Sequence, residues 1–285
     1  MELTTDPRAF QAQCMDMRGQ GLETALVPTM GWLHDGHLSL IRWARDNARR
    51  VLVSVFVNPT QFDRADDLEA YPRDLERDAA LAREAGADVL FAPEASELYA
   101  PDHATWVRVP DLEKHLCGAS RPGHFQGVCT VVSKLFNLAM PTMAVFGDKD
   151  WQQLAIIRRM ARDLDFPVRI VGRPIVREAD GLAMSSRNVR LDPDHREQAP
   201  GIHEGLRMVR DKAAEGETGP EALREALKMF YAMRLPDGVV DYIEFVDPEA
   251  VTPVDRLLPR TLVAVAVAFG PVRLIDNMLV GTEVA

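Results

Sequence analysis

Short, continuous apolar segments alternate with helical patterns through the first half of the chain. Five of them read "TALVP" at 24–28, "VLVSVFVNP" at 51–59, "ADVLFAP" at 87–93, "TMAVFGD" at 142–148 and "VRIVG" at 168–172. Apolar runs of this length without alternation are typical of parallel strands that are covered on both faces. Between the first two, "HLSLIRWARDNARR" has apolar residues near helical spacing, which completes a βαβ unit. The pattern predicts an α/β fold with a doubly wound, Rossmann-like parallel sheet.

Past about residue 176 the pattern changes. Two helical stretches, "DHREQAPGIHEGLRMVRDKAAEG" and "GPEALREALKMFYAMRL", precede three strand-like segments, "VVDYIEFVD", "TLVAVAVAF" and "VRLIDNMLVG". Helices followed by a run of strands predict a small α+β unit with an antiparallel sheet. We therefore expect two domains, a Rossmann-like domain over residues 1–175 and a smaller C-terminal α+β domain over residues 176–285.

Composition and charge exclude several classes of protein. The formal net charge is −10 and the arginines are interleaved with acids, so a nucleic-acid-binding surface is not expected. No segment approaches the roughly 18 uninterrupted apolar residues of a membrane helix, and "MELTTDPRAF" lacks the pattern of a signal peptide. Cys14, Cys117 and Cys129 form no paired motif. We expect a cytoplasmic protein with no membrane or nucleic-acid partner and with three buried thiols.

Two histidines follow the first apolar segment, in "PTMGWLHDGHLSLI". His34 and His37 lie where a strand ends and a helix begins, and their spacing puts both on one side of the first helical turn. Gly36 leaves room for a phosphate, which the amides of a helix N-terminus favour, and a histidine can donate to a phosphate oxygen. Two alternatives stay open: capping or surface histidines, and a zinc site that also uses the histidines and cysteine of "HLCGASRPGH".

A second strand end carries "VFGDKDWQQL". Lys149 is a mobile point charge suited to a phosphate, and Asp150 could accept hydrogen bonds from ribose hydroxyls. Gln153 falls near the first helical turn and could reach a small polar substrate. Alone, "DKD" is more often an exposed turn, but ligands of open α/β sheets bind at the carboxyl ends of strands.

Two further segments carry candidate binding groups. In "GLAMSSRN", Ser185, Ser186 and Arg187 offer hydroxyls, amides and a planar cation to the β- and γ-phosphates of a nucleotide, with a helix cap as the alternative. In "FVNPTQFDRADDLEAYPRDLERD", Asn58 and Gln61 are neutral groups that can hold a carboxylate and hydroxyls. Asp78 and its acidic neighbours could help to hold Mg²⁺, although most of this run is expected to be a solvated helix face.

Together and in this order, these motifs resemble the nucleotidyltransferase superfamily and, more narrowly, the pantothenate synthetase family of ATP-dependent pantoate:β-alanine ligases. The resemblance is carried by "PTMGWLHDGHLSLI", "VSVFVNPTQF", "YPRDLERD", "RPGHFQGVCTVV", "FGDKDWQQL" and "READGLAMSSRN". It implies that ATP and Mg²⁺ support the condensation of (R)-pantoate with β-alanine to pantothenate, through pantoyl adenylate, with release of AMP and pyrophosphate. It also implies a homodimer, a first domain that binds ATP and pantoate, and a second domain that acts as a lid.

The resemblance further implies residue roles. Residues expected to face ATP are Met30, Gly31, Trp32, Leu33, His34, Asp35, Gly36, His37, Gly147, Asp148, Lys149, Asp150, Val176, Met184, Ser185, Ser186 and Arg187. Those expected to act in catalysis are His37, as the proton donor, with His34, Lys149, Ser185, Ser186 and Arg187. Residues expected to hold pantoate and β-alanine are Gln61, Gln153, Asn58 and Arg121, and Asp78 is the candidate metal ligand.

The departures from the family pattern are small. Family members often carry glutamate where Asp35 and Asp148 stand, and tyrosine where Trp151 stands. Each exchange keeps the charge or the aromatic ring, so it affects fine geometry rather than the type of reaction. Rival interpretations are a coenzyme adenylyltransferase, which would need no amine substrate, and a regulatory module that binds ATP without chemistry. The acidic chain weighs against a transfer-RNA synthetase.

Overall fold

The computed structural model describes residues 1–281, and the chain divides into two compact units. The first unit comprises Met1–Pro110, Arg121–Asp148 and Ile156–Pro174, and the second comprises Asp111–Ser120, Lys149–Ala155 and Ile175–Ala285. Two short segments that lie among the elements of the first unit in sequence, 111–120 and 149–155, therefore group with the C-terminal unit.

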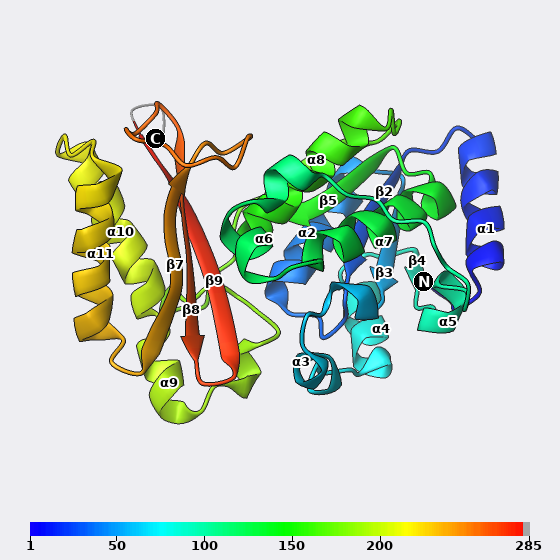
Figure 1. Cartoon of the computed structure of the whole chain (residues 1–285). Coiled ribbons are helices and arrows are strands. Elements are labelled where there is room, and N and C mark those ends of the chain that lie inside the picture. Colours follow the sequence, from blue (N-terminus) through cyan, green and yellow to red (C-terminus); the bar gives the residue numbers. More distant parts are fainter. Residues whose placement is uncertain (282–285) are drawn as a thin grey trace. The chain divides into compact units, whose positions relative to one another are not determined.

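A six-stranded sheet forms the centre of the first unit (Figure 1). Its strands are β1 (Glu2–Thr4), β2 (Thr24–Thr29), β3 (Arg50–Val55), β4 (Val89–Phe91), β5 (Met143–Gly147) and β6 (Arg169–Arg173). The order is β1-β4-β3-β2-β5-β6, and every neighbouring pair is parallel. The predicted α/β fold with a parallel sheet is confirmed. β1 was not predicted, because its three residues, two of them exposed, give no apolar run.

Burial explains why the central strands form. Residues 25–27 of β2 and 51–53 of β3 are fully buried, as expected for strands with covered faces. The helices of this unit are α1 (Pro7–Gly19), α2 (Asp35–Asn47), α3 (Ala65–Glu69), α4 (Leu75–Glu84), α5 (Ala95–Leu98), α7 (His124–Ala139) and most of α8 (Trp151–Asp163), with one 3₁₀ turn, η1 (Pro59–Gln61). The start of α1 is typical: the Asp6 carboxylate accepts from the amide of Arg8, and Pro7 takes the first helical position.

The strand order sets where a ligand can bind. β2 and β5 are neighbours, but the chain continues from β2 to β3 on one side and from β5 to β6 on the other. Such a reversal opens a crevice at the carboxyl ends of the two strands, the usual ligand position in doubly wound sheets. The histidine motif follows β2 and Asp148 follows β5, both within the first unit, so each of the two predicted strand-end motifs begins at this reversal.

The second unit is built on an antiparallel sheet of β7 (Gly238–Val246), β8 (Thr261–Phe269) and β9 (Val272–Val280). Its helices are α6 (Leu116–Ser120), α9 (Pro193–Gln198), α10 (Gly201–Ala214) and α11 (Pro220–Arg234). The 3₁₀ turn η4 (Asn188–Arg190) lies inside this unit, and η2 (Pro110–Glu113) and η3 (Asp148–Asp150) each begin one residue before one of its segments. The predicted small α+β part is confirmed. The first predicted helix is two helices, because Pro200 lacks an amide hydrogen and interrupts the pattern.

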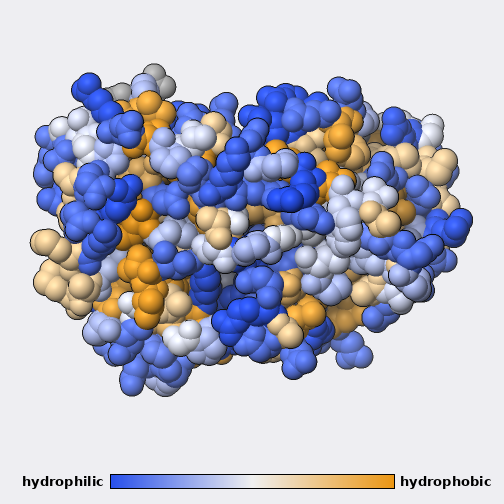
Figure 2. Space-filling view, viewed as in Figure 1, coloured by the Kyte–Doolittle hydropathy of each residue, from blue (hydrophilic) through white to orange (hydrophobic). Residues whose placement is uncertain are grey.

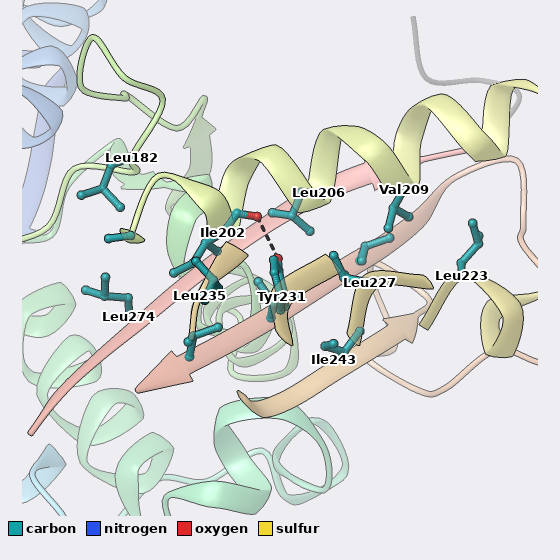
Figure 3. Close-up of a cluster of buried hydrophobic side chains, with 14 of the residues drawn as sticks. Leu182, Ile202, Leu206, Val209, Leu223, Leu227, Tyr231, Leu235, Ile243 and Leu274 are labelled. Atoms are coloured by element: carbon teal, nitrogen blue, oxygen red, sulfur yellow. Dashed lines mark hydrogen bonds between the residues drawn. The ribbon is translucent and has the colours of Figure 1, made fainter. Parts of the chain in front are cut away.

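The core of the second unit lies between its helices and its sheet (Figure 3). Leu206 and Val209 of α10 and Leu227 of α11 are fully buried there, and burial of such a side chain stabilises a fold by roughly 1.5–3 kcal/mol. The hydroxyl of Tyr231 is also buried and donates to the carbonyl of Ile202, at 2.8 Å. This bond ties α11 to the start of α10 and leaves the hydroxyl satisfied.

The visible surface is mostly hydrophilic, with hydrophobic side chains in small groups (Figure 2). Among the described residues, no helix has the length and apolar character needed to cross a membrane. Cys14, Cys117 and Cys129 are buried and form no disulfide within the described residues, which confirms the expected buried thiols. Burial raises the pKa of the Cys14 thiol to about 12, so it is an inert part of the core.

Candidate active site

The two histidines of the motif lie at the N-terminus of α2. His34 is the N-cap residue, and its backbone amide donates to Nδ1 of His37 at 3.4 Å. The two rings stack with their centroids 4.0 Å apart. Because Nδ1 of His37 accepts a hydrogen bond, the neutral ring carries its proton on Nε2 and can donate it to an anion. The geometry therefore gives His37 the tautomer that the predicted role needs.

The residues just before the histidines have an unusual backbone. Gly31 and Trp32 both have positive φ, +83° and +50°. The carboxylate of Asp78 in α4 accepts from the amide of Trp32 at 2.8 Å and from that of Leu33 at 2.7 Å. Asp78 is only 1% exposed, and burial raises its pKa although both amides oppose this shift. Each carboxylate oxygen of Asp78 thus accepts a hydrogen bond from the backbone that leads into the histidine motif.

Gln61 belongs to a buried hydrogen-bonded group after β3. Its Oε1 accepts from Nδ2 of Asn58 at 3.0 Å, and its Nε2 points to Sδ of Met30 at 3.2 Å. The Asn58 amide is fixed in turn, because its Oδ1 accepts from the hydroxyls of Tyr99 and Thr60, both at 2.9 Å. The structure thus brings together Asn58 and Gln61, the predicted substrate residues of this segment, with Met30 from the predicted ATP segment.

Arg121 and His124 hold Gln61 by its backbone. The carbonyl of Gln61 lies 2.7 Å from Nδ1 of His124 and accepts from Nη2 of Arg121 at 3.2 Å. Arg121 also forms an ion pair with Asp63, at 2.9 Å. The sequence did not connect Asp63, Tyr99 or His124 with Gln61. Asp63 reads as one acid of a charged run, Tyr99 lies far along the chain, and His124 was considered only for the alternative zinc site.

Gly147 ends β5, and Asp148 follows it as the first residue of η3. Both are half-buried. Burial raises the pKa of Asp148, an effect that the nearby charges of Arg158 and Arg173 oppose. Asp148 is thus a half-buried acid near cations, as expected where a sheet binds a polar ligand.

Lys149, Asp150 and Gln153 follow in the second unit. The Lys149 carbonyl accepts from Nδ2 of Asn277 in β9 at 2.9 Å, while its side chain is half-buried. Within residues 1–281, no carboxylate forms an ion pair with the Lys149 ammonium. The neighbouring Gln152 is a structural residue that the sequence did not reveal: it is buried and donates to the carbonyls of Leu112 and His115, both at 2.8 Å.

The serine-containing loop is also ordered within the second unit. The amide of Met184 donates to the carbonyl of Val176 at 3.0 Å, so the two ends of the loop pair. Ser186 is buried, and the Ser185 hydroxyl accepts from the amide of Arg187 at 3.2 Å, ahead of η4. Ser185 therefore stabilises a local turn and is not the cap of a helix, since the N-cap residue of η4 is Arg187, which is half-buried.

The predicted residues fall into two groups, one in each unit. The first unit holds Met30 to His37, Asn58, Gln61, Asp78, Arg121, Gly147 and Asp148. The second holds Lys149, Asp150, Gln153, Val176, Met184, Ser185, Ser186 and Arg187. Within the described residues, no group of three or more His, Cys, Asp and Glu side chains could hold a metal ion.

Comparison with known families decides the assignment of the chain. A family model described as pantoate-beta-alanine ligase matches residues 2–279. The chain belongs to the pantoate-beta-alanine ligase family. The family resemblance expected from the motifs is confirmed, and with it the assignment of the chain as a ligase.

Relatives of this family match over almost their whole length. A pantothenate synthetase of Nitratidesulfovibrio vulgaris is 56% identical over 279 residues, 98% of this chain and 99% of the relative. The solved pantothenate synthetase of Thermus thermophilus has a TM-score of 0.91 at 45% identity, over 98% of this chain and 99% of that one. The pantoate-beta-alanine ligase of Francisella tularensis, solved with beta-gamma ATP and beta-alanine, has a TM-score of 0.82 at 32% identity and covers 100% and 99%.

Proposed function

We propose that this ligase condenses (R)-pantoate with β-alanine to pantothenate at the expense of ATP, as an AMP-forming carbon–nitrogen ligase of vitamin B5 and coenzyme A biosynthesis. The match of the pantoate-beta-alanine ligase family over residues 2–279 carries this proposal. The relative solved with ATP and β-alanine supports these two substrates. The family match does not support the rival interpretation, a coenzyme adenylyltransferase.

The first step joins pantoate to AMP. The carboxylate of pantoate attacks the α-phosphorus of ATP, the bond to the β-phosphate oxygen breaks, and pyrophosphate leaves. Because both reactants are anions, the protein contributes mainly by positioning them and by stabilising the phosphate charge. The Nε2–H of His37 donates to an α-phosphate oxygen, and His34 lies beside it.

The second step forms the amide. The neutral amine of β-alanine attacks the acyl carbon of pantoyl adenylate, a proton leaves the nitrogen, and AMP departs. No covalent enzyme intermediate is needed. Gln61, with Asn58, Gln153 and Arg121, holds the two small substrates, since these amides and this cation suit a carboxylate and hydroxyls. The amide of Gln61 already has a fixed orientation through Asn58.

The remaining predicted residues serve ATP. Lys149, Ser185, Ser186 and Arg187 neutralise the β- and γ-phosphates, and Met184 lies in the same loop. Residues proposed to face the adenosine are Gly147, Asp148, Asp150 and Val176. Met30 to Gly36 form the backbone wall of the phosphate site. Mg²⁺ would be bound mainly by the phosphates of ATP and would screen their charge, since such sites need no cage built only of protein groups.

Three wider features complete the proposal. Residues 176–285 act as a lid that keeps water from the adenylate, since a hydrolysed adenylate would waste ATP. The enzyme works as a homodimer and in the cytoplasm, in line with the family resemblance.

Pyrophosphate release from Mg²⁺-ATP tests the proposal. Purified protein is given pantoate alone, pantoate with β-alanine, or neither. We expect a burst with pantoate alone that is stoichiometric with enzyme, and steady turnover only when β-alanine is added. No release under any condition, from protein that binds ATP, would contradict the proposed function.

A further inference from the structure

The loop before the histidine motif is held in a conformation that it would not adopt by itself. Gly31 and Trp32 lie in succession in the left-handed region, at φ +83° and +50°. A side chain other than glycine in this region costs of order 1–2 kcal/mol, so surrounding contacts must stabilise Trp32 there. The loop leads directly into His34, the N-cap of α2.

Asp78 supplies the contacts that hold this loop. Its two oxygens accept one amide each, those of Trp32 and Leu33, at 2.8 and 2.7 Å. The fit is close, since a Cβ built on Gly31 would lie 2.9 Å from Oδ2 of Asp78. Hydrogen bonds from backbone amides to an ionised acceptor are about twice as strong as neutral ones.

The neighbours of Asp78 reinforce the same arrangement. The guanidinium of Arg77 lies 4.8 Å from the ring centre of Trp32. The amide of Gly31 donates to the Thr29 hydroxyl at 3.2 Å, and that hydroxyl donates to the carbonyl of Ser54 at 2.7 Å. Each amide from Gly31 to Leu33 thus has an acceptor, and the path of the chain into α2 is fixed.

We propose that Asp78 is a positioning residue of the ligase reaction. Its buried carboxylate sets the backbone of residues 31–33, and through it the place of His34 and of the Nε2 proton of His37 against the α-phosphate. The oxygens that a metal ion would need are used for this purpose. The inference rests on the proposed function, because the histidines have to contact ATP for their position to matter.

Asp78→Asn tests the proposal, because it keeps the shape and replaces one acceptor by an NH₂ group. One buried loop amide then faces a donor, a loss of roughly 1–3 kcal/mol. We expect kcat/KM for ATP to fall about 10- to 100-fold, an order of magnitude set by that loss. KM for pantoate and the Mg²⁺ concentration for half-maximal activity at saturating ATP should change less than about twofold, since neither depends directly on the loop amides.

Controls separate positioning from stability and from charge. Glu84→Gln removes an exposed carboxylate from the same helix and should leave kcat/KM for ATP unchanged. Circular dichroism and thermal unfolding show that each variant is folded at the assay temperature. If Asp78→Asn does not fold, Gly31→Ala presses on the same carboxylate from the loop side and should give the same selective loss.

Two results would overturn the proposal. One is a folded Asp78→Asn variant with kcat/KM for ATP within about twofold of the parent enzyme, the spread that ordinary surface changes produce. The other is a raised Mg²⁺ requirement with full activity at high Mg²⁺, which would make Asp78 a metal ligand.

If the parent enzyme itself shows no β-alanine-dependent turnover, the proposed function fails. ATP affinity measured by calorimetry then judges Asp78 separately: weaker binding by Asp78→Asn supports its role, and equal binding refutes it.

Discussion

Lys149→Ala should reduce pantoate-dependent pyrophosphate release by roughly 100- to 1,000-fold, the range seen when one charge-stabilising donor is removed from an active site. The lysine follows β5 at the reversal of strand order, and within residues 1–281 its ammonium forms no ion pair with a carboxylate. Its backbone is held through the carbonyl that Asn277 contacts. Because alanine keeps this contact, the loss should come from the missing charge and not from unfolding.

Stopped-flow or quenched-flow measurement of the burst gives the rate of adenylate formation directly. Lys212→Ala is a matched control, since Lys212 is an exposed lysine in the last turn of α10. It should leave the burst unchanged. Near-normal adenylate formation by Lys149→Ala, with a normal circular dichroism spectrum, would refute the role given to Lys149.

Gly127→Ala should impair both the stability of the first unit and the binding of pantoate. Gly127 lies in α7, where a Cβ would clash with the carbonyl oxygen of Thr60 and stand 2.6 Å from its carbon and 2.7 Å from the amide nitrogen of Gln61. These are backbone atoms, so no rotamer change can relieve the clash. We expect a loss of about 1–3 kcal/mol in the free energy of unfolding, as for other overpacked sites.

The displaced segment carries Gln61, so KM for pantoate should rise more than KM for ATP. Asn58 moves with it, since its Nδ2 donates to the Gly127 carbonyl at 3.2 Å. Gly19→Ala is the control: Gly19 ends α1, and a Cβ there meets nothing within 4 Å. Urea unfolding and steady-state kinetics provide the comparison. Equal stability and equal pantoate KM in the two variants would show that α7 does not set the position of Gln61.

The sequence predicted the parallel sheet because its strands are buried on both faces and therefore read as continuous apolar runs. It could not show that residues 111–120 and 149–155 group with the C-terminal unit. That grouping depends on contacts between distant parts of the chain, such as the amide of Leu116 with Oε1 of Glu244 at 3.1 Å. Nor did it show β1, whose three residues form a strand only by pairing with β4.

The candidate site was predictable where function depends on strand ends. The motifs at 34–37 and 148–150 could be placed after β2 and β5, because polar residues there follow apolar runs. The role of Asp78 could not be predicted, because its carboxylate accepts hydrogen bonds from Trp32 and Leu33, which are more than forty residues away in the sequence. In the sequence, Asp78 is only one of several acidic residues in the charged segment "YPRDLERD". Burial is what distinguishes it from its exposed neighbours.

The transfer of labelled oxygen tests most directly whether the carboxylate of pantoate attacks the α-phosphorus. Pantoate labelled with oxygen-18 in its carboxylate is turned over with ATP and β-alanine, and the AMP is analysed by mass spectrometry. We expect one labelled oxygen in each AMP and one retained in the amide carbonyl of pantothenate. Unlabelled AMP, with the label in inorganic phosphate or retained on pantoate, would contradict the adenylate mechanism.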